Sequence, residues 1–308
     1  MKLKVFTAVG TTLAFLVQHG LDVLRVIWLP ALLQLAGYLL LMPAYISAVT
    51  MLGVDPPADA AETWARLAPV IVQPFLFFVI SVALTVMMFN GLTRLIISGE
   101  KPRAPFLLRW GADEWRVLGG WVLLFLIFLA LEVAIVVTGF LIRGIMALGP
   151  GPGVILSVIA FIVILVIGVW ICVRLSLLVP ATLAAGKIGL GVSWERTEDD
   201  FWNLLGFWLI FTVAALVIQL SLIGFLTPPG YFEAIQSGGF GSPEAMRDAM
   251  RKANEVMAKS YDLSDSGNVI RMLVGYLISM VGAVVTAIAG AVAWRMMTDT
   301  TEKSADVF

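Results

Sequence analysis

Residues 117–142 read VLGGWVLLFLIFLALEVAIVVTGFLI, and Glu132 is the one charged side chain among them. The hydrocarbon core of a bilayer is about 30 Å thick and a helix rises about 1.5 Å per residue, so roughly 20 apolar residues can cross it. This stretch is therefore predicted to be a membrane-spanning helix.

Other stretches of the chain have the same length and character. The predicted spans are 25–48, 70–97, 117–142, 153–180, 203–226 and 269–295. The sequence thus predicts an all-α fold, in which residues 1–308 form a single integral membrane domain built as a polytopic bundle of six transmembrane helices. Residues 227–268 form its one long loop between spans.

The composition supports a membrane protein and excludes several other classes. Hydrophobic residues make up 60% of the chain and charged residues 13%, where soluble domains carry about 25%. The mean hydropathy of +0.97 excludes a water-soluble fold. A net charge of −1 attracts no phosphate backbone, so no nucleic-acid partner is expected, and one cysteine excludes a disulfide scaffold.

The distribution of lysine and arginine predicts the orientation of the spans. Twelve of them fall on the side of the termini, the 2–3 loop and the 4–5 loop, and seven fall on the other side, five of those in the long loop. Cytoplasmic loops are enriched in these residues. Both termini are therefore expected in the cytoplasm.

The first residues are predicted to form an interfacial helix. The apolar run from Val5 to Val17 is too short to span a bilayer, and no cleavage site of a secretory signal follows it. Apolar side chains recur at helical spacing on one side of it: Phe6, Val9, Leu13 and Leu16. Such a helix lies in the plane of the membrane interface.

A second amphipathic helix is predicted in the long loop, on the periplasmic side. Ser242 is a good N-cap and Pro243 suits the first turn. One face then carries apolar residues and the others carry charges; the apolar set is Met246, Ala249, Met250, Ala253, Val256 and Met257. This helix is expected on the bundle or bilayer surface, or as a lid or docking element for a partner protein.

The chain contains an internal repeat. Shifted by 87 residues, 113–121 (DEWRVLGGW) aligns with 200–208 (DFWNLLGFW), and a fainter copy begins at Asp22. Each even-numbered span closes with an arginine. The sequence therefore predicts three hairpin-like repeats, each entering behind an aspartate and returning to an arginine.

The repeated residues have the properties of helix caps and interface anchors. Aspartate satisfies free N–H groups at a helix start, tryptophan favours the headgroup level, and arginine suits a helix end. The predicted caps are Asp22, Asp113 and Asp200, and the predicted cytoplasmic anchors are Arg94, Arg174, Arg295, Trp115, Trp121, Trp202 and Trp208. A lipid-headgroup or ligand role for these residues is the alternative.

One segment carries a resemblance to known membrane proteins. Residues 174–180 (RLSLLVP) are followed by Gly189, by Ser193-Trp194-Glu-Arg-Thr197 and by 201–206 (FWNLLG). This pattern resembles the membrane domain of glycerophosphodiester phosphodiesterase-like proteins and of related uncharacterised six-helix families of the bacterial inner membrane. The resemblance implies family membership and a bacterial inner (cytoplasmic) membrane.

The resemblance does not imply the phosphodiesterase activity. That reaction depends on a metal site and acid–base histidines in a soluble barrel, whereas His19 is the one histidine of this chain. No HExxH motif, Ser–His pair, paired acids or cysteine cluster is present either. No enzyme activity, metal or other cofactor is therefore predicted.

Glu132 is the sharpest candidate for chemistry within the membrane. It lies near the middle of the third span, where a charged carboxylate costs roughly 2.5–3.5 kcal/mol. The repeat places Gln219 at the same depth of the fifth span, so the two could share a hydrogen bond. The other intramembrane polar candidates are Gln34 and Arg174. A clamp between helices, a proton or substrate site, and a carboxyl group that faces lipid or a partner all remain open.

Small residues in the sixth span indicate close helix packing. Ser279, Ala283, Ala287 and Ala291 follow one another at intervals of four. Such a stripe packs within the bundle or against a second subunit or protein partner.

The leading functional prediction is a non-enzymatic membrane protein, structural or accessory in lipid or envelope processes, with membrane lipids as partners. The rival is a transporter of a small molecule, lipid or ion that uses Glu132.

The predicted orientation can be tested in the long loop. A cysteine at Gly238 should react with a membrane-impermeant maleimide added from the periplasmic side, because 227–268 is predicted to lie there. Labelling at position 238 from the cytoplasmic side alone would reverse the orientation.

Overall fold

The computed structural model describes residues 2–54, 60–100, 110–146, 150–237 and 242–298. Most of these residues are helical, and no strand occurs among them. Gly238 lies outside them.

Six of the helical segments are long and apolar enough to cross a membrane, as predicted. They are Gly20–Pro43, Ile71–Ile97, Ala112–Phe140, Val154–Ala185, Phe201–Leu226 and Ser266–Thr298. The chain therefore has the helices of a multi-pass membrane protein.

The fourth predicted span, 153–180, is not one continuous helix. Helix α5 (Pro150–Leu175) ends before Ser176, and a short helix, α6 (Leu178–Ala185), follows. Pro180 explains the break, because its ring would clash with the Ser176 carbonyl group in a continuous helix and it has no N–H to bond there. Within the first turn of α6 the missing N–H costs nothing.

The chain divides into two compact units. Unit 1 comprises Met1–Val26, Val86–Phe211 and Val285–Phe308, and unit 2 comprises Ile27–Thr85 and Thr212–Val284. Four helices contribute residues to both units: α2 (Gly20–Val54), α3 (Ala60–Ile97), α8 (Phe201–Leu226) and α11 (Ser266–Thr298).

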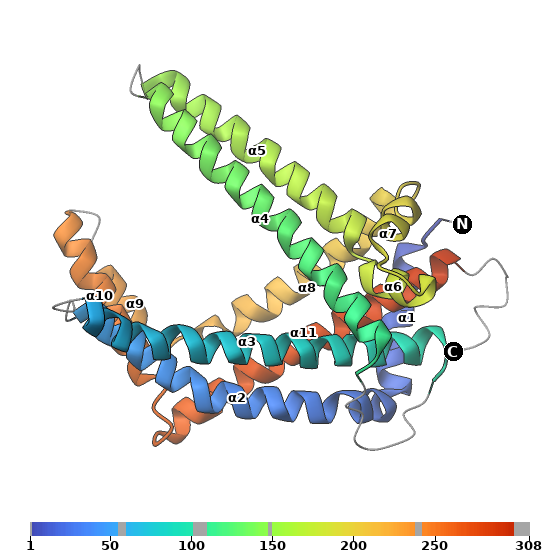
Figure 1. The fold of residues 1–308 in the computed structure, drawn as a ribbon, viewed down its shortest axis with the longest axis horizontal. Coiled ribbons are helices and arrows are strands. Elements are labelled where there is room, and N and C mark those ends of the chain that lie inside the picture. The colour runs from blue at the N-terminus through green and yellow to red at the C-terminus, as the bar shows by residue number, and fades with distance from the viewer. Residues whose placement is uncertain (1, 55–59, 101–109, 147–149, 238–241, 299–308) are drawn as a thin grey trace. The chain divides into compact units, whose positions relative to one another are not determined.

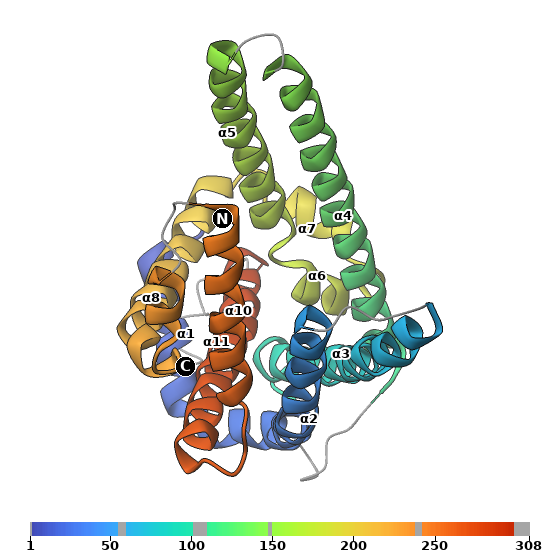
Figure 2. The ribbon, with the colours of Figure 1, turned by 90° about the vertical axis from the view of Figure 1, so that its left-hand side faces the viewer.

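Unit 1 contains a long helical hairpin and a small apolar core. Helices α4 (Ala112–Met146) and α5 lie side by side, with α6 and α7 (Leu190–Arg196) at one end of the pair (Figures 1 and 2). The core includes Leu177, Leu204, Phe207 and Trp294. Helix α1 (Val5–Gln18) also packs against this core through Ala8.

Unit 2 contains α9 (Tyr231–Gln236) and the predicted loop helix, α10 (Pro243–Lys259). The predicted start of α10 is confirmed, because the Ser242 side chain accepts a hydrogen bond from the Ala245 N–H at 3.1 Å. Of its apolar face, Ala249 and Ala253 are buried, whereas Met246 and Met250 are exposed.

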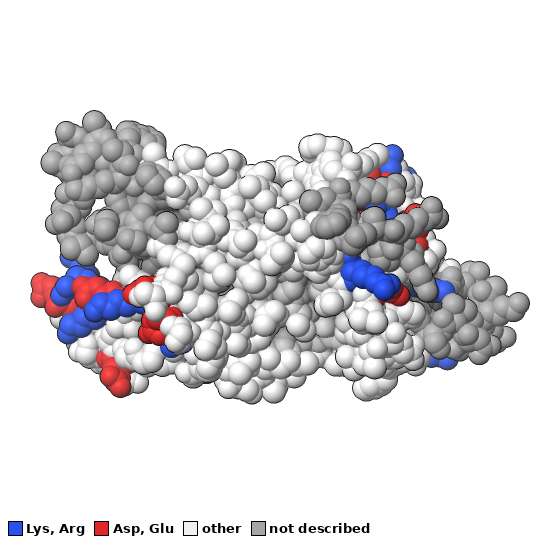
Figure 3. Space-filling model, turned by 90° about the horizontal axis from the view of Figure 1, so that it is seen from below, with Lys and Arg blue, Asp and Glu red and all other residues white. Residues whose placement is uncertain are grey.

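The surface of the spans is apolar. Lysine, arginine, aspartate and glutamate gather in a few groups on the face drawn in Figure 3, and most of the described surface there is uncharged. Exposed phenylalanines such as Phe125, Phe140 and Phe161 illustrate this. Water would disfavour such a surface, whereas lipid tails match it.

Gly189 allows the turn between α6 and α7. A Cβ atom at this position would lie 2.5 Å from the Thr182 backbone nitrogen and 2.6 Å from the Ala181 carbonyl carbon. The Gly189 N–H also donates to the Thr182 hydroxyl at 3.0 Å. The backbone of α6 and the residue before α7 therefore approach too closely for any side chain.

We expect Gly189→Ala to lower the free energy of unfolding in detergent by about 1–3 kcal/mol, because backbone atoms must move to admit the methyl group. Gly191→Ala is the matched control, since a Cβ atom there meets nothing within 4 Å and lies in α7. Thermal unfolding of the purified protein measures both. Equal midpoints for the two variants would contradict this account of the turn.

Candidate functional site

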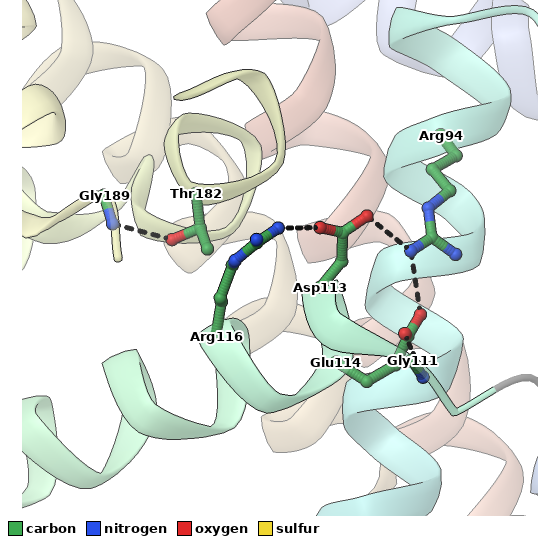
Figure 4. A network of polar contacts seen from close by, with 7 residues as sticks. All are labelled: Arg94, Gly111, Asp113, Glu114, Arg116, Thr182 and Gly189. Carbon is green, nitrogen blue, oxygen red and sulfur yellow. Dashed lines mark hydrogen bonds and ion pairs between the residues drawn. The ribbon is translucent and has the colours of Figure 1, made fainter. Parts of the chain in front are cut away.

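The most strongly charged cluster of unit 1 joins α3 to α4. Arg94 Nη2 lies 3.0 Å from Asp113 Oδ2 and 2.9 Å from Glu114 Oε1 (Figure 4). Arg116 Nη1 lies 2.7 Å from Asp113 Oδ1, and the Gly111 N–H donates to Glu114 Oε2 at 2.8 Å. One guanidinium group thus bridges two carboxylates, and each carboxylate has a second partner.

The local sequence favours these pairs. Asp113 and Glu114 stand in the first turn of α4, where the helix dipole stabilises negative charge, and Arg94 stands in the last turn of α3, where it stabilises positive charge. The Glu114 side chain is 1% exposed and that of Arg94 16%. A buried carboxylate is tolerated only with such a partner. We call these residues, with Arg116 and Gly111, the Arg94 network.

The second cluster holds the end of α5. Ser193 and Thr197 donate their hydroxyl groups to the Arg174 carbonyl oxygen, at 2.8 and 3.2 Å. The Arg174 guanidinium donates to the Trp194 carbonyl oxygen at 3.0 Å. Its central carbon lies 5.6 Å from the ring centre of Trp170 and 5.3 Å from that of Trp194.

This cluster gives a physical role to the Ser-Trp-x-x-Thr element. Helix α5 ends with carbonyl groups that have no partner within the helix, and the two hydroxyls of the element satisfy one of them. The tryptophan between the hydroxyls stacks on the arginine. The spacing of Ser193 and Thr197 therefore lets α7 and the residue after it bind the end of α5.

The third predicted anchor, Arg295, also binds protein. Its Nη1 donates to the Ile96 carbonyl oxygen at the end of α3, at 3.1 Å. Arg196 donates to the Met297 carbonyl oxygen near the end of α11. The guanidinium groups of Arg94, Arg174 and Arg295 thus all bind helix ends or residues next to them.

The three predicted cap aspartates stand at helix starts. Asp22 is in the first turn of α2 and binds Arg25 at 3.1 Å. Asp113 is the second residue of α4. Asp200 directly precedes α8 and is 4% exposed; it accepts from the Leu3 N–H and the Asn203 amide, both at 2.9 Å. Asp200 thereby ties the N-terminal segment to the start of α8 within unit 1.

The four predicted anchor tryptophans fall into two classes. Trp115 and Trp202 are 62% and 78% exposed. Trp121 and Trp208 are half-buried and form T-shaped contacts with phenylalanine rings, Phe89 for the former and Phe207 for the latter. The exposed pair suits a headgroup position, and the half-buried pair contributes to packing.

A polar cavity of about 520 Å³ adjoins the Arg94 network. Its lining residues include Thr93, Arg94, Ser98, Glu100 and Asp113. Thr93 is 1% exposed, and its hydroxyl has no hydrogen-bond partner in the described part of the chain. Buried polar groups are usually paired, so this hydroxyl is available to a small polar molecule.

The intramembrane candidates have separate surroundings. Gln34 donates to the Ser81 carbonyl oxygen at 2.9 Å and to the Thr85 hydroxyl at 2.8 Å, which links α2 to α3 within unit 2. Glu132 and Gln219 are both exposed. They belong to different units, so the hydrogen bond between them stays a prediction.

One of these features was missed by sequence reasoning. Glu114 is the buried member of the Arg94 network, yet the repeat drew attention only to its neighbour Asp113. Its signal was a second acid in the first turn of a helix.

Among the described residues no group of histidine, cysteine, aspartate and glutamate side chains could hold a metal ion.

Comparisons with protein-family models, with curated proteins and with solved structures found no match to this chain. The resemblance to the phosphodiesterase-like membrane domain therefore depends on the sequence pattern alone.

We expect Arg94→Met to destabilise the protein by about 3–5 kcal/mol, because it leaves the Glu114 carboxylate buried beside one N–H group. Arg116→Gln removes an arginine that is 40% exposed from the same network and should cost about 0–1 kcal/mol. Thermal unfolding in detergent distinguishes the two. A small effect of Arg94→Met would mean that the Glu114 pair does not hold α3 to α4.

Proposed function

We propose that this chain is a non-enzymatic, multi-pass protein of the bacterial inner membrane, structural or accessory in lipid or envelope processes. One observation carries the proposal: the arginines beside the spans bind other groups of the protein. Arg94, Arg174 and Arg295 each bind carboxylates or backbone carbonyls of the protein. Such bonds stabilise the framework of helices.

The proposed architecture is a bundle of three hairpin-like repeats. The burial pattern supports it: from Trp115 to Trp121 and from Trp202 to Trp208, equivalent positions are exposed, half-buried and buried in the same order. Similar burial at equivalent positions is expected of repeated helix starts, because each copy would pack through the same face.

The proposed topology places both termini in the cytoplasm, with α1 in the membrane interface. The burial pattern of α1 supports its placement in the membrane interface. Ala8, Thr12 and Phe15 are buried, whereas Phe6 and Leu13 on another face are 84% and 52% exposed. A helix that packs by one side and exposes apolar residues on the other suits a lipid boundary.

Membrane lipids are the proposed partners, with a protein partner or a second copy as a further possibility. The small-residue face of α11 and the exposed methionines of α10 are the surfaces considered. Ala287 and Ala291 are already buried within unit 1, whereas Ser279 is exposed. Only part of the small-residue face is therefore available to a partner.

A transporter that uses Glu132 is the second candidate. The observation in its favour is an exposed carboxyl group in the middle of an apolar helix of spanning length. Such a residue is costly in lipid and is commonly functional.

Substitution of Glu132 separates the two candidates. Under the accessory proposal, Glu132→Gln keeps both hydrogen-bonding ends, so it should restore any growth or envelope defect of a deletion strain and leave the unfolding midpoint nearly unchanged. Glu132→Leu should cost on the order of 0.6–2 kcal/mol if the carboxyl binds another helix.

The transporter candidate predicts a different result for the same variant. An amide cannot ionise, so Glu132→Gln should fold normally and fail to restore the deletion strain. That outcome would overturn the accessory proposal.

A further inference from the structure

Four of the five tyrosines of the chain line one cavity of unit 2. The cavity has a volume of about 560 Å³, and its tyrosines are Tyr38, Tyr231, Tyr261 and Tyr276. They come from α2, from α9, from the turn after α10 and from α11. We call this space the tyrosine cavity.

Hydrogen bonds and ring contacts hold the walls of the tyrosine cavity. The Tyr276 hydroxyl donates to the Ala31 carbonyl oxygen at 2.5 Å, and the rings of Tyr38 and Tyr276 stack at 6.2 Å between centres. The Tyr261 side chain lies close enough to that of Tyr38 to interact with it. These contacts fix two helices and a loop around the space, so the cavity is largely formed in advance of any ligand.

Arg271 supplies the cavity with a positive charge. Its Nη1 donates to the Asn268 side-chain oxygen at 2.9 Å, and Asn268 is held in turn by the Lys259 carbonyl oxygen at 2.9 Å. Within the described residues Arg271 forms no ion pair with a carboxylate. Two aspartates nearby in the sequence bind their own turns: Asp262 accepts a hydrogen bond from the Ser264 N–H, and Asp265 accepts one from the Gly267 N–H.

The chemistry of the lining indicates an anionic amphiphile. A guanidinium group and phenol hydroxyls donate hydrogen bonds to a phosphate, and Arg271 would repel a cationic headgroup. The same cavity has an apolar wall, formed by the tyrosine rings, Leu226 and Met272. Leu226 and Met272 belong to helices of membrane-spanning length. Its volume is in the range of ordinary ligand pockets.

We propose that the tyrosine cavity binds the phosphate headgroup and upper chains of an anionic lipid, with Arg271 as the charge-reading residue and Tyr231 as a further donor. This inference deepens the proposed function, because it names a lipid class, and it rests on that function only in placing the chain in a membrane.

A titration of the full-length protein in an uncharged detergent tests the proposal. Dihexanoyl phosphatidic acid, dihexanoyl phosphatidylcholine and inorganic phosphate are the three probes, and isothermal calorimetry reads binding. We expect phosphatidic acid to bind about tenfold or more tightly than either of the others. Equal binding of phosphatidylcholine would overturn the charge argument, and equal binding of inorganic phosphate would overturn the lipid argument.

Variants locate the binding. Arg271→Gln should weaken phosphatidic acid binding by about tenfold, because it removes the positive charge. Arg247→Gln, on an exposed position of α10 outside the cavity lining, is the matched control and should bind like the unmodified chain. Unchanged binding by a folded Arg271→Gln protein would overturn the proposal.

A second variant covers the case in which Arg271→Gln fails to fold. Tyr231→Phe keeps the ring and removes one hydroxyl, so it should weaken binding of phosphatidic acid and leave the unfolding midpoint unchanged; equal affinity would count against the site.

The titration measures lipid binding, and the Glu132→Gln experiment measures cellular function. Failure of one is therefore distinguishable from failure of the other.

Discussion

The ends of the helices need polar partners, and the surface of the spans supplies none. An α-helix leaves carbonyl groups without partners at its last turn, and hydrocarbon cannot hydrogen bond to them. In unit 1 this demand is met by side chains: Ser193 and Thr197 on the Arg174 carbonyl, and Arg295 on the Ile96 carbonyl. Arg94 adds a charge pair at the same kind of position. The specific bonds of the unit thus concentrate where helices end.

The spans were predictable from the sequence because hydropathy alone determines them. A run such as 117–142 can be stable only in lipid, whatever its neighbours are. The break after α5 was harder to place, since the prediction continued the span to Pro180. The helix instead ends at Leu175, because the proline interrupts hydrogen bonding to the preceding turn.

The partners of the polar residues were not predictable in the same way. Arginine at a helix end and aspartate at a helix start are favoured separately by the helix dipole, and each was singled out on that ground. Which arginine meets which acid depends on how the helices pack, and this explains why buried Glu114 was overlooked beside Asp113. The tyrosine cavity is a stronger case, because its residues come from positions 38, 231, 261 and 276, and no periodic pattern connects them.

Arg271 differs from Arg94 and Arg174 in how its guanidinium group is satisfied, and this difference bears on function. Arg94 meets two carboxylates, whereas Arg174 has a backbone carbonyl as acceptor and lies beside two tryptophan rings, with its buried Nε atom unpaired in the described part of the chain. Arg271 donates to a neutral amide and lines a cavity. A guanidinium group binds an anionic acceptor more strongly than a neutral one. Among these three arginines, Arg271 is the one that lines the tyrosine cavity, and the apolar wall beside it favours an anion that carries lipid chains.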